Sequence, residues 1–547
     1  MSRNQEPLLS NRPSSEQSND NDLAEEDALL TGERVQRPSG NDKIKWREWI
    51  LFGWAFAATA VVIVLAVLYQ NQKTTQSHSS STPSGKRNLI FMVSDGMGPT
   101  SLSMTRSFRQ QQYGLPYGDI LVLDDHLIGQ SRTRSSSSLV TDSAAGATAF
   151  SCGKKSYNGA ISILPDFTPC GTVLEAAKKE GYMTGLVVTT RITDATPACF
   201  ASHVNLRQEE DLIADQLIGN HPLGHTVDLI LGGGRCRFLP NTTSASCRED
   251  SKDLVEEAKQ KGYTYIDNRK DFDSLQTGNG LKLPFLGLFA DEDIPYEIDR
   301  RFEDDTYPAL REMAETALKA LSAATKNSDK GFFLMIEGSR IDHAGHGNDP
   351  AAQVHEVLSY DHAFQSVLSF IEKEQTPSLL VGTSDHETGG LSAARQLHET
   401  YPEYLWYPEV LANASHSAHW LAHAYRDHLA ASTSRGDGDK KKLKHYLRKL
   451  LKEHMGVHDA SSTELSTLIA QPEIASYVFA DIISRRAQIG WSTHGHSAAD
   501  VNIYASDSVS AKPLVGNHEN TEVGKFLRDW LDVDVDAVTK ELRRKSR

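Results

Sequence analysis

Cysteine is scarce in this chain, which has five among 547 residues. The residues that gather in short motifs are carboxylates and imidazoles, so a sulfur-rich structural zinc site is not indicated. Five cysteines also leave at least one unpaired. Cys236 and Cys247, eleven positions apart in a loop rich in glycine, asparagine and serine, are the best disulfide candidates. Cys152 with Cys170 stays open as a second pair, and Cys199 is interpreted as a buried thiol.

An excess of positive charge is also absent, because 72 aspartates and glutamates outnumber 57 lysines and arginines and leave a net charge of −15. This balance argues against a general affinity for nucleic acid, and no nucleic-acid-binding role is expected. An anionic substrate would need local cations to overcome the field of the whole molecule. The rest of the composition is ordinary for a globular protein, and the length suffices for one large domain or two to three ordinary ones.

Long uncharged runs are missing except for one. Residues 49–69 carry no charge over 21 positions, which is enough for a helix to cross about 30 Å of hydrocarbon. Five lysines and arginines lie in residues 34–47, whereas Lys73 is the only basic residue in the fifteen that follow the run. The positive-inside rule then predicts a single-pass, type II transmembrane helix with a cytosolic N-terminus. The remainder of the chain is expected in a lumen or outside the cell.

Two polar segments flank this run. Residues 1–48 are rich in Ser, Asn, Asp, Glu and Pro, which predicts a disordered cytosolic tail. Glu6, Leu8 and Leu9 match the acidic dileucine pattern that adaptor complexes read, although such short patterns are common in disordered tails. That signal would suit delivery to a vacuole. Residues 70–85 predict a flexible stalk.

Residues 86–547 alternate short apolar runs with helical patterns, which predicts an α/β fold. The expected elements are strands at 88–93, 185–189, 227–231, 332–336, 379–382 and 501–504 and helices at 172–179 and 307–324. Continuous apolar strands indicate a central, mostly parallel sheet covered by helices on both faces, which is a three-layer α/β/α sandwich. Residues 397–486 interrupt this alternation of strands and helices and are interpreted as a helical insertion.

Carboxylates and imidazoles recur where several of these strands end, and functional residues of such folds gather at that edge. Mixed oxygen and nitrogen donors suit a cluster of two zinc ions and one magnesium ion. The candidate ligands are Asp95, Glu337, Asp342, His346, Asp385, His386 and His496.

Ser143 stands in the run Asp142-Ser143-Ala144-Ala145-Gly146. The small residues would seat its hydroxyl at a helix N-terminus, where backbone N–H groups and the helix dipole favour a phosphate. A serine beside metal ions can be deprotonated and become a nucleophile. The local sequence alone would equally suit a serine that only caps a helix. The prediction of a nucleophile therefore depends on the whole set of motifs. Together they predict metal-assisted phosphoryl transfer.

From about Asn88 to about Tyr504 these blocks, in the same order, resemble those of the alkaline phosphatases. The motif around Ser143 and the run Asp-His-Glu-Thr-Gly-Gly that begins at Asp385 carry the resemblance most specifically. With its anchor, the chain is similar to the fungal vacuolar members of that family. The resemblance implies hydrolysis of phosphate monoesters through a covalent phosphoserine, with broad specificity and an alkaline optimum. It also implies a homodimer in the vacuole membrane that releases phosphate in the lumen.

The resemblance also implies which residues hold the metals. The first zinc is assigned Asp342, His346 and His496, the second Asp95, Asp385, His386 and the oxygen of Ser143, and the magnesium Thr196 and Glu337, with Asp194 through water. His494 is expected to lie outside these sets. The histidine at position 343 follows the animal enzymes, whereas Asp194 follows the bacterial ones. The metal preference of the third site and the pH optimum of the reaction therefore stay open.

Arg207 matches the family's phosphate clamp, because it lies thirteen residues after Asp194. A guanidinium group can bind two phosphate oxygens and stays charged at alkaline pH. Asp142 and His343 are expected to act behind the groups that touch metal or substrate. Two sequons, at Asn241 and Asn413, predict glycosylation on the lumenal side.

Two alternatives remain. A phosphodiesterase, sulfatase or phosphomutase could share the metal scaffold, but sulfatases need Cys/Ser-x-Pro-x-Arg and Ser143 is followed by Ala-Ala-Gly. Phosphodiesterases usually carry a threonine nucleophile and lack an arginine like Arg207. An inactive, membrane-anchored binding protein is the second alternative. It is disfavoured because every expected metal and phosphate residue is present.

Overall fold

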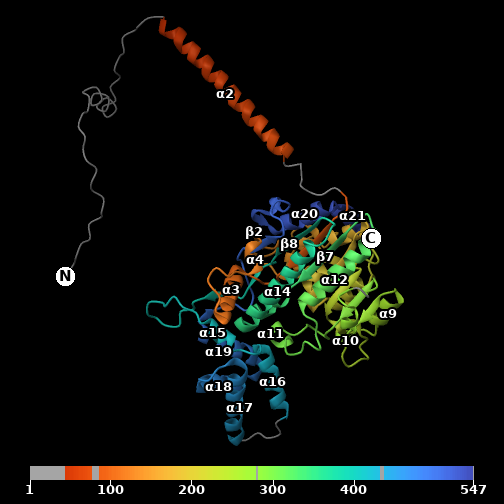
Figure 1. Cartoon of the computed structure of the whole chain (residues 1–547), viewed down its shortest axis with the longest axis vertical. Coiled ribbons are helices and arrows are strands. Elements are labelled where there is room, and N and C mark those ends of the chain that lie inside the picture. Colours follow the sequence, from red (N-terminus) through yellow and green to blue (C-terminus); the bar gives the residue numbers. More distant parts are fainter. Residues whose placement is uncertain (1–42, 77–84, 279–280, 432–436, 546–547) are drawn as a thin grey trace, which may run out of the picture. The chain divides into compact units, whose positions relative to one another are not determined.

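A computed structural model of the chain describes residues 43–76, 85–278, 281–431 and 437–545 (Figure 1). The chain divides into two compact units, with the boundary between Ser80 and Ser81. The first unit contains helix α2, Lys43–Gln76, which includes the uncharged run and extends beyond it on both sides. Within the described residues, none of the helices combines the length and the hydropathy needed to span a membrane. The dileucine residues Glu6, Leu8 and Leu9 lie outside the described residues.

The second unit is built on a ten-stranded sheet with the strand order β14-β2-β13-β8-β1-β7-β3-β4-β6-β5. Its strands are β1 Asn88–Val93, β2 Leu127–Arg132, β3 Met183–Arg191, β4 Leu229–Gly233, β5 Thr264–Ile266, β6 Phe285–Leu288, β7 Phe332–Glu337, β8 Ser378–Thr383, β13 Val501–Ala505 and β14 Gly516–Glu519. Every pairing is parallel except those of β13, which runs antiparallel to β8 and to β2. The predicted α/β fold with a mostly parallel sheet is therefore confirmed.

All six predicted strands are present, and their ends differ from the prediction by no more than two residues. Four strands of the ten-stranded sheet were not predicted: β2, β5, β6 and β14. β2 and β14 lie at one edge of the sheet and are largely exposed, so they lack a continuous apolar run. β5 and β6 have only three and four residues, which is too short for a periodic signal.

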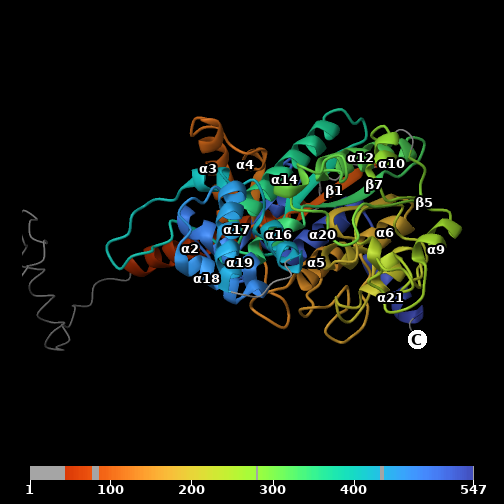
Figure 2. The ribbon, with the colours of Figure 1, turned by 90° about the horizontal axis from the view of Figure 1, so that it is seen from below.

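Helices cover both faces of the sheet, as Figure 2 shows from below. The principal ones are α3 Pro99–Tyr113, α5 Ser143–Cys152, α6 Val173–Lys179, α7 Ala195–Ala201, α8 Glu210–Leu217, α12 Leu310–Thr325, α14 Pro350–Ile371, α20 Asn520–Leu531 and α21 Val535–Lys545. One apolar core joins the sheet to α5, α6, α20 and α21, and a second joins its other face to α12 and α14. Short helices in the connections are α4 Val122–Asp125, α9 Leu254–Gln260, α10 Arg269–Ser274, α11 Glu297–Arg300 and α13 Arg340–His346.

The predicted insertion is a helical bundle that extends from one end of the sheet (Figure 1). Its helices are α15 Pro408–Ala412, α16 Ala418–Ala431, α17 Asp437–Met455, α18 Ser462–Ala470 and α19 Ala475–Ala487. They share a third apolar core with residues of α3 and α14, which fixes the bundle to the rest of the unit. Two-stranded ladders flank it, formed by β9 Glu387–Thr388 with β12 His496–Ser497 and by β10 Ser392–Ala393 with β11 Ile489–Gly490.

Four of the five cysteines form disulfides. Cys236 pairs with Cys247, as expected, and Cys152 pairs with Cys170, which resolves the pairing that the sequence left open. Cys199 is a free, buried thiol, and burial raises its pKa to about 12. Both sequon asparagines, Asn241 and Asn413, are exposed.

Candidate active site

Four neighbouring strands of the sheet carry the carboxylates of the site at their C-terminal ends. In the order β8, β1, β7 and β3, the strands lead to Asp385, Asp95, Glu337 and Asp194. Because parallel strands end at the same edge, residues almost 300 positions apart in the chain come together there. Gly96 makes this approach feasible: its φ is +78°, and a Cβ at that position would lie 2.5 Å from the Cα of Asp342. A larger residue at position 96 would push α13 away from β1.

The first predicted zinc set is assembled from α13 and β12. Asp342 and His346 lie one turn apart on α13, with Oδ2 3.4 Å from Nε2. His496 Nε2 lies 3.1 Å from His346 Nε2 and 3.6 Å from Asp342 Oδ1. His494 is not part of this set, because its Nδ1 lies 2.9 Å from the backbone oxygen of His346 instead.

The second predicted zinc set is completely buried and adjoins the first. His386 Nε2 lies 3.5 Å from Asp95 Oδ1 and 3.2 Å from Asp385 Oδ2. The imidazole rings of His386 and His496 are stacked with centroids 3.5 Å apart, so the two sets share a boundary. His386 also lies within 4.8 Å of the ligand atoms of Asp342 and His496.

The third predicted set lies on the other side of Asp95. The Thr196 hydroxyl donates to Asp95 Oδ2 at 3.4 Å, and Glu337 is buried at the end of β7. Asp194 does not point freely toward this set. It caps α7, accepts from Arg207 Nη2 at 2.8 Å, and lies 3.4 Å from Arg191 Nη1. The structure therefore places Asp194 among arginines beside the set, and its contribution through water stays a prediction.

Ser143 begins helix α5, whose ten residues are all buried. The Asp142 side chain caps this helix by accepting the Ala145 amide at 2.9 Å, and its second oxygen accepts the Gly159 amide at 2.8 Å. Ser143 Oγ lies 3.0 Å from His386 Nε2, at the edge of the second set. Gly146 allows the close approach of α5, since a Cβ there would lie 3.0 Å from Asp385 Cβ.

Arg207 lies next to the start of α5. Its Nη1 is 3.6 Å from Asp142 Oδ2, and its Nη2 is bonded to Asp194. Burial disfavours its charge, but Asp194 and Asp142 outweigh that effect and raise the pKa of the guanidinium above its ordinary value. The arginine therefore stays charged and is held between the serine and the third set.

Three residues of the site were not predicted. The Thr388 hydroxyl donates to Asp342 Oδ1 and lies 3.2 Å from His386 Nδ1, so it orients a residue of each zinc set. It belongs to the run that begins at Asp385, which could have indicated it. Asp293 and Arg191 have no motif; Asp293 lies 3.3 Å from both His343 Nδ1 and Arg191 Nη1. Asp194 and Asp293 outweigh burial and raise the pKa of His343 to about 9.

The electrostatics of the buried carboxylates fit bound cations. Asp95 Oδ1, Asp385 Oδ2 and Glu337 Oε2 are buried without a hydrogen-bond donor. Burial and then the charges of Asp385 and Asp342 raise the pKa of Asp95, and burial and the charge of Asp194 raise the pKa of Glu337 to about 8. Unpaired buried carboxylates are costly unless they are neutralised or coordinate a metal. Burial and His386 lower the pKa of His496 to about 4, which leaves its imidazole neutral, as a metal ligand must be.

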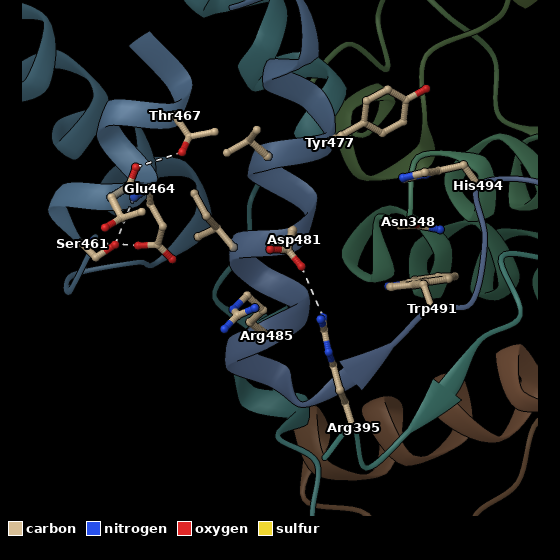
Figure 3. Close-up of a pocket in the computed structure, with 13 residues that line it drawn as sticks. Asn348, Arg395, Ser461, Glu464, Thr467, Tyr477, Asp481, Arg485, Trp491 and His494 are labelled. Atoms are coloured by element: carbon tan, nitrogen blue, oxygen red, sulfur yellow. Dashed lines mark hydrogen bonds and ion pairs between the residues drawn. The ribbon is translucent and has the colours of Figure 1, made fainter. Parts of the chain in front are cut away.

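A cavity of about 640 Å³ lies between helices α18 and α19 and the segment before β12, and His494 in its wall contacts the backbone of His346 (Figure 3). Tyr477 packs on His494 with ring centroids 4.5 Å apart, and Trp491 donates to Ser484 Oγ at 3.0 Å. Arg395 crosses the cavity to Asp481 at 3.3 Å. The walls are polar and aromatic, and neither Ser143 nor Arg207 lines this cavity.

Comparison with known proteins identifies the family. The alkaline phosphatase family model matches residues 86–533. The chain is 49% identical to the repressible alkaline phosphatase of Saccharomyces cerevisiae over 95% of this chain and 94% of the relative. Among solved structures, the alkaline phosphatase of Thermus thermophilus matches with 28% identity and a TM-score of 0.70, covering 83% of this chain and 94% of that one.

A further solved structure contains magnesium. A variant of the alkaline phosphatase TAB5, which has magnesium bound in its M3 site, matches with 26% identity and a TM-score of 0.54 over 82% of this chain and 98% of that one. Sequence, fold and the donor atoms at the sheet edge thus lead to the same class of enzyme. This chain belongs to the alkaline phosphatase family and is a metal-dependent hydrolase of phosphate monoesters.

Proposed function

We propose that the chain cleaves phosphate monoesters through a covalent phosphoserine at Ser143, with two zinc ions and one magnesium ion per subunit. The observation that carries this proposal is the position of Ser143 Oγ, at the N-terminus of α5 and 3.0 Å from His386 Nε2. Asp342, His346 and His496 would hold one zinc, and Asp95, Asp385 and His386 the other. Thr196 and Glu337 would hold magnesium with Asp194 nearby, which is supported by the M3 magnesium of the TAB5 variant.

The residues of the chain divide the reaction between them. Bound metal ions supply Lewis acidity, which lowers the pKa of hydroxyl groups and stabilises negative charge on oxygen. Ser143 Oγ attacks phosphorus and the alcohol leaves; water then attacks the phosphoserine, Ser143 Oγ departs, and inorganic phosphate is released. Arg207 and the free N–H groups at the start of α5 bind the phosphate oxygens and hold the group in line with the serine. Asp142 positions both, because it caps α5 and faces Arg207.

The experiment that tests the covalent step is hydrolysis of several phosphate monoesters in the presence of a competing alcohol such as glycerol. A shared phosphoserine gives the same ratio of phosphoglycerol to free phosphate with every leaving group. A ratio that changes with the leaving group would show that water attacks the substrate directly. Residues 86–547 loaded with zinc and magnesium serve as enzyme, across pH 6 to 10, and the Ser143→Ala variant should form neither product.

We also infer broad specificity and an alkaline optimum. The charged groups around Ser143 address the phosphate and not the leaving group, which supports tolerance for the leaving group. Values of kcat/KM for aryl, sugar and nucleoside monophosphates should therefore fall within about one order of magnitude at equal leaving-group pKa. A spread of three orders or more would assign the enzyme one substrate. A phosphodiester that is cleaved faster than monoesters would favour the alternative within the superfamily.

The location and the anchor are proposals that rest on the sequence, and the assembly is a proposal that rests on family resemblance alone. The uncharged run, the basic residues before it and the dileucine pattern support a vacuolar, type II, single-pass protein that binds adaptor complexes through Glu6, Leu8 and Leu9. Extraction of membranes with alkaline carbonate tests the anchor, with the full chain compared with a variant that lacks residues 49–69.

Loss of glycan mass in Asn241→Gln and Asn413→Gln variants tests lumenal exposure of the catalytic unit. Sedimentation of residues 86–547 tests the proposed homodimer.

A further inference from the structure

A second group of potential metal ligands lies outside the catalytic edge. Glu175 on α6, His203 after α7 and His221 after α8 bring one carboxylate and two imidazoles together, with ligand atoms within 4.8 Å of one another. Their side chains are 0%, 5% and 2% exposed, so the group is shielded from solvent. The rings of His203 and His221 are stacked with centroids 5.0 Å apart. None of these residues has a part in the proposed phosphoryl transfer.

The hydrogen bonds around the group orient it as metal ligands are usually oriented. His203 Nδ1 lies 3.1 Å from the Ser162 carbonyl, which can only accept, so Nδ1 carries the hydrogen and Nε2 faces Glu175 Oε1 at 2.9 Å. The Leu223 amide donates to His221 Nδ1 at 3.3 Å, so this nitrogen is unprotonated, and an ion bound there would replace this long hydrogen bond. Glu175 Oε2 accepts the Thr172 amide at 3.0 Å, which leaves Oε1 for the imidazoles. A backbone carbonyl behind one ligand nitrogen is the arrangement that fixes metal-binding histidines.

The distances fit an ion of the size of zinc. Ligands bound at about 2.0–2.2 Å to a tetrahedral zinc lie about 3.3–3.6 Å from one another. Glu175 Oε1 is 2.9 Å from His203 Nε2 and 4.0 Å from His221 Nδ1, so one pair is shorter and the other longer than that range, and the side chains would shift by about 0.4 Å to bind the ion. The first catalytic set has a narrower spread, from 3.1 to 3.6 Å. Two histidines and a glutamate are also a ligand set that zinc uses in proteins.

Space for a fourth ligand lies beside Glu175. A cavity of about 270 Å³ is lined by Glu175, Leu223 and His225 but by neither His203 nor His221, and it could admit a water molecule on the side of Glu175. The positive charges of the lysines that line the cavity are balanced by carboxylates, since Lys178 pairs with Asp228 at 2.6 Å and Lys179 with Glu541 at 2.7 Å.

We propose that Glu175, His203 and His221 bind a zinc ion that is distinct from the catalytic metals and that ties α6 to the segments after α7 and α8. His203 lies four residues before Arg207, and its amide donates to Gln216 Oε1 of α8 at 2.7 Å. The ion would therefore brace the segment that carries the phosphate clamp. Its binding does not depend on the proposed phosphoserine mechanism.

The test is a count of zinc per chain. Wild type, His221→Ala and His225→Ala are saturated with zinc and magnesium, freed of loose metal by desalting, and analysed by plasma mass spectrometry. His225 lines the same cavity but bonds to Asp228 and Tyr263, so its variant is the matched control. We expect His221→Ala to hold one zinc fewer than wild type and the control, with kcat on a monoester within about twofold of theirs. Equal zinc contents in all three proteins would overturn the proposal.

A second measurement covers the case in which His221→Ala does not fold. Diffraction from wild-type crystals on both sides of the zinc absorption edge should show an anomalous peak between Glu175 Oε1, His203 Nε2 and His221 Nδ1, apart from the catalytic peaks. Catalytic peaks without a peak at this place would overturn the proposal. Neither the zinc count nor the peak depends on turnover, so an inactive enzyme with the extra zinc would contradict the proposed function alone.

Discussion

Ser143 shows how a common residue acquires a special setting. Its hydroxyl faces His386 Nε2 because α5 begins at this residue, and α5 begins there because the Asp142 side chain caps it. The small side chains that follow let α5 lie against Asp385. A serine in this place can be deprotonated and its phosphate ester can be bound by amides of the same helix.

The first prediction concerns this hydroxyl. Ser143→Ala should lower kcat on a phosphate monoester by about 10³-fold or more, because no other group can form the covalent intermediate. The metal content should remain that of wild type, since the carboxylates and imidazoles are untouched. Ser151→Ala, at a buried position of the same helix, is the matched control and should keep its activity. Steady-state kinetics and metal analysis check both; a Ser143→Ala variant with more than a tenth of wild-type kcat would refute the assignment.

Arg207 provides the second prediction. Replacement by alanine removes a charged fork that can bond two phosphate oxygens, and kcat/KM should fall about 10²-fold, or about 2.7 kcal/mol in transition-state stabilisation. Arg207→Lys keeps a charge without the fork, so its kcat/KM should lie between those of wild type and Arg207→Ala. Inhibition by inorganic phosphate is the direct readout, because its binding should weaken in the same order. Unchanged phosphate inhibition in Arg207→Ala would place the clamp elsewhere.

Secondary-structure elements decide which residues meet. β8, β1, β7 and β3 are adjacent, so one edge collects Asp385, Asp95, Glu337 and Asp194 from four distant parts of the chain. Helix α14 contains a buried residue that destabilises the folded state when it is ionised. Glu356 on α14 is buried, and burial raises its pKa to about 7, although it accepts the Glu297 amide at 2.6 Å.

This buried glutamate gives the third prediction. Its folded-state pKa is raised, so the folded state binds a proton more tightly than the unfolded chain does. Its contribution therefore becomes unfavourable as pH rises from about 4.5 and is fully unfavourable above about 7. Glu356→Gln keeps an acceptor for the amide and removes the charge. It should raise the free energy of unfolding at pH 8 by roughly 1–3 kcal/mol and leave it nearly unchanged at pH 4.5. Urea unfolding at the two pH values measures this change. An equal gain in the free energy of unfolding at both pH values would show that ionisation of Glu356 is not its cause.

The connection after β4 gives the fourth prediction. Cys236 and Cys247 close a loop with a sequence separation of 11. Loss of this crosslink in Cys236→Ala/Cys247→Ala should lower the free energy of unfolding by about 2–3 kcal/mol, because the unfolded chain gains conformational entropy. Cys199→Ala is the comparison without a crosslink. A double variant as stable as wild type in thermal unfolding would show that the disulfide contributes nothing.

At the scale of the whole molecule, bound cations and the fold depend on one another. The catalytic edge concentrates carboxylates that each have one oxygen without a hydrogen-bond donor, in a chain whose net charge is already −15. Cations that bind the folded state alone stabilise it by mass action, by about 4 kcal/mol when the free ion exceeds its Kd a thousandfold.

Metal removal is the fifth prediction. Dialysis against a chelator should lower the thermal midpoint, and more at pH 9 than at pH 6, because repulsion among the ionised carboxylates is greatest at high pH. Zinc and magnesium together should restore both the midpoint and the activity. Calorimetry at the two pH values checks this expectation. A chelated protein that loses activity but keeps its midpoint at both pH values would show that the ions serve chemistry alone.

The sequence by itself determined the class of fold and most of the site. Apolar runs marked the central strands, because strands buried on both faces have no polar positions, and the short motifs indicated the chemistry of Ser143, Asp342 and His386. It missed β2 and β14, since exposed edge strands have no such pattern. Whether residues 49–69 anchor the chain stays a prediction.

Only the tertiary structure decided which distant residues meet. Asp293 and Arg191 have no motif, yet the fold brings them to His343 and Asp194. The group of Glu175, His203 and His221 was likewise invisible, because its members come from three separate segments with unrelated spacing. The physical reason is common to all of these cases. Local sequence fixes the period and the ends of an element, whereas contacts between elements follow from how their apolar faces pack on the sheet.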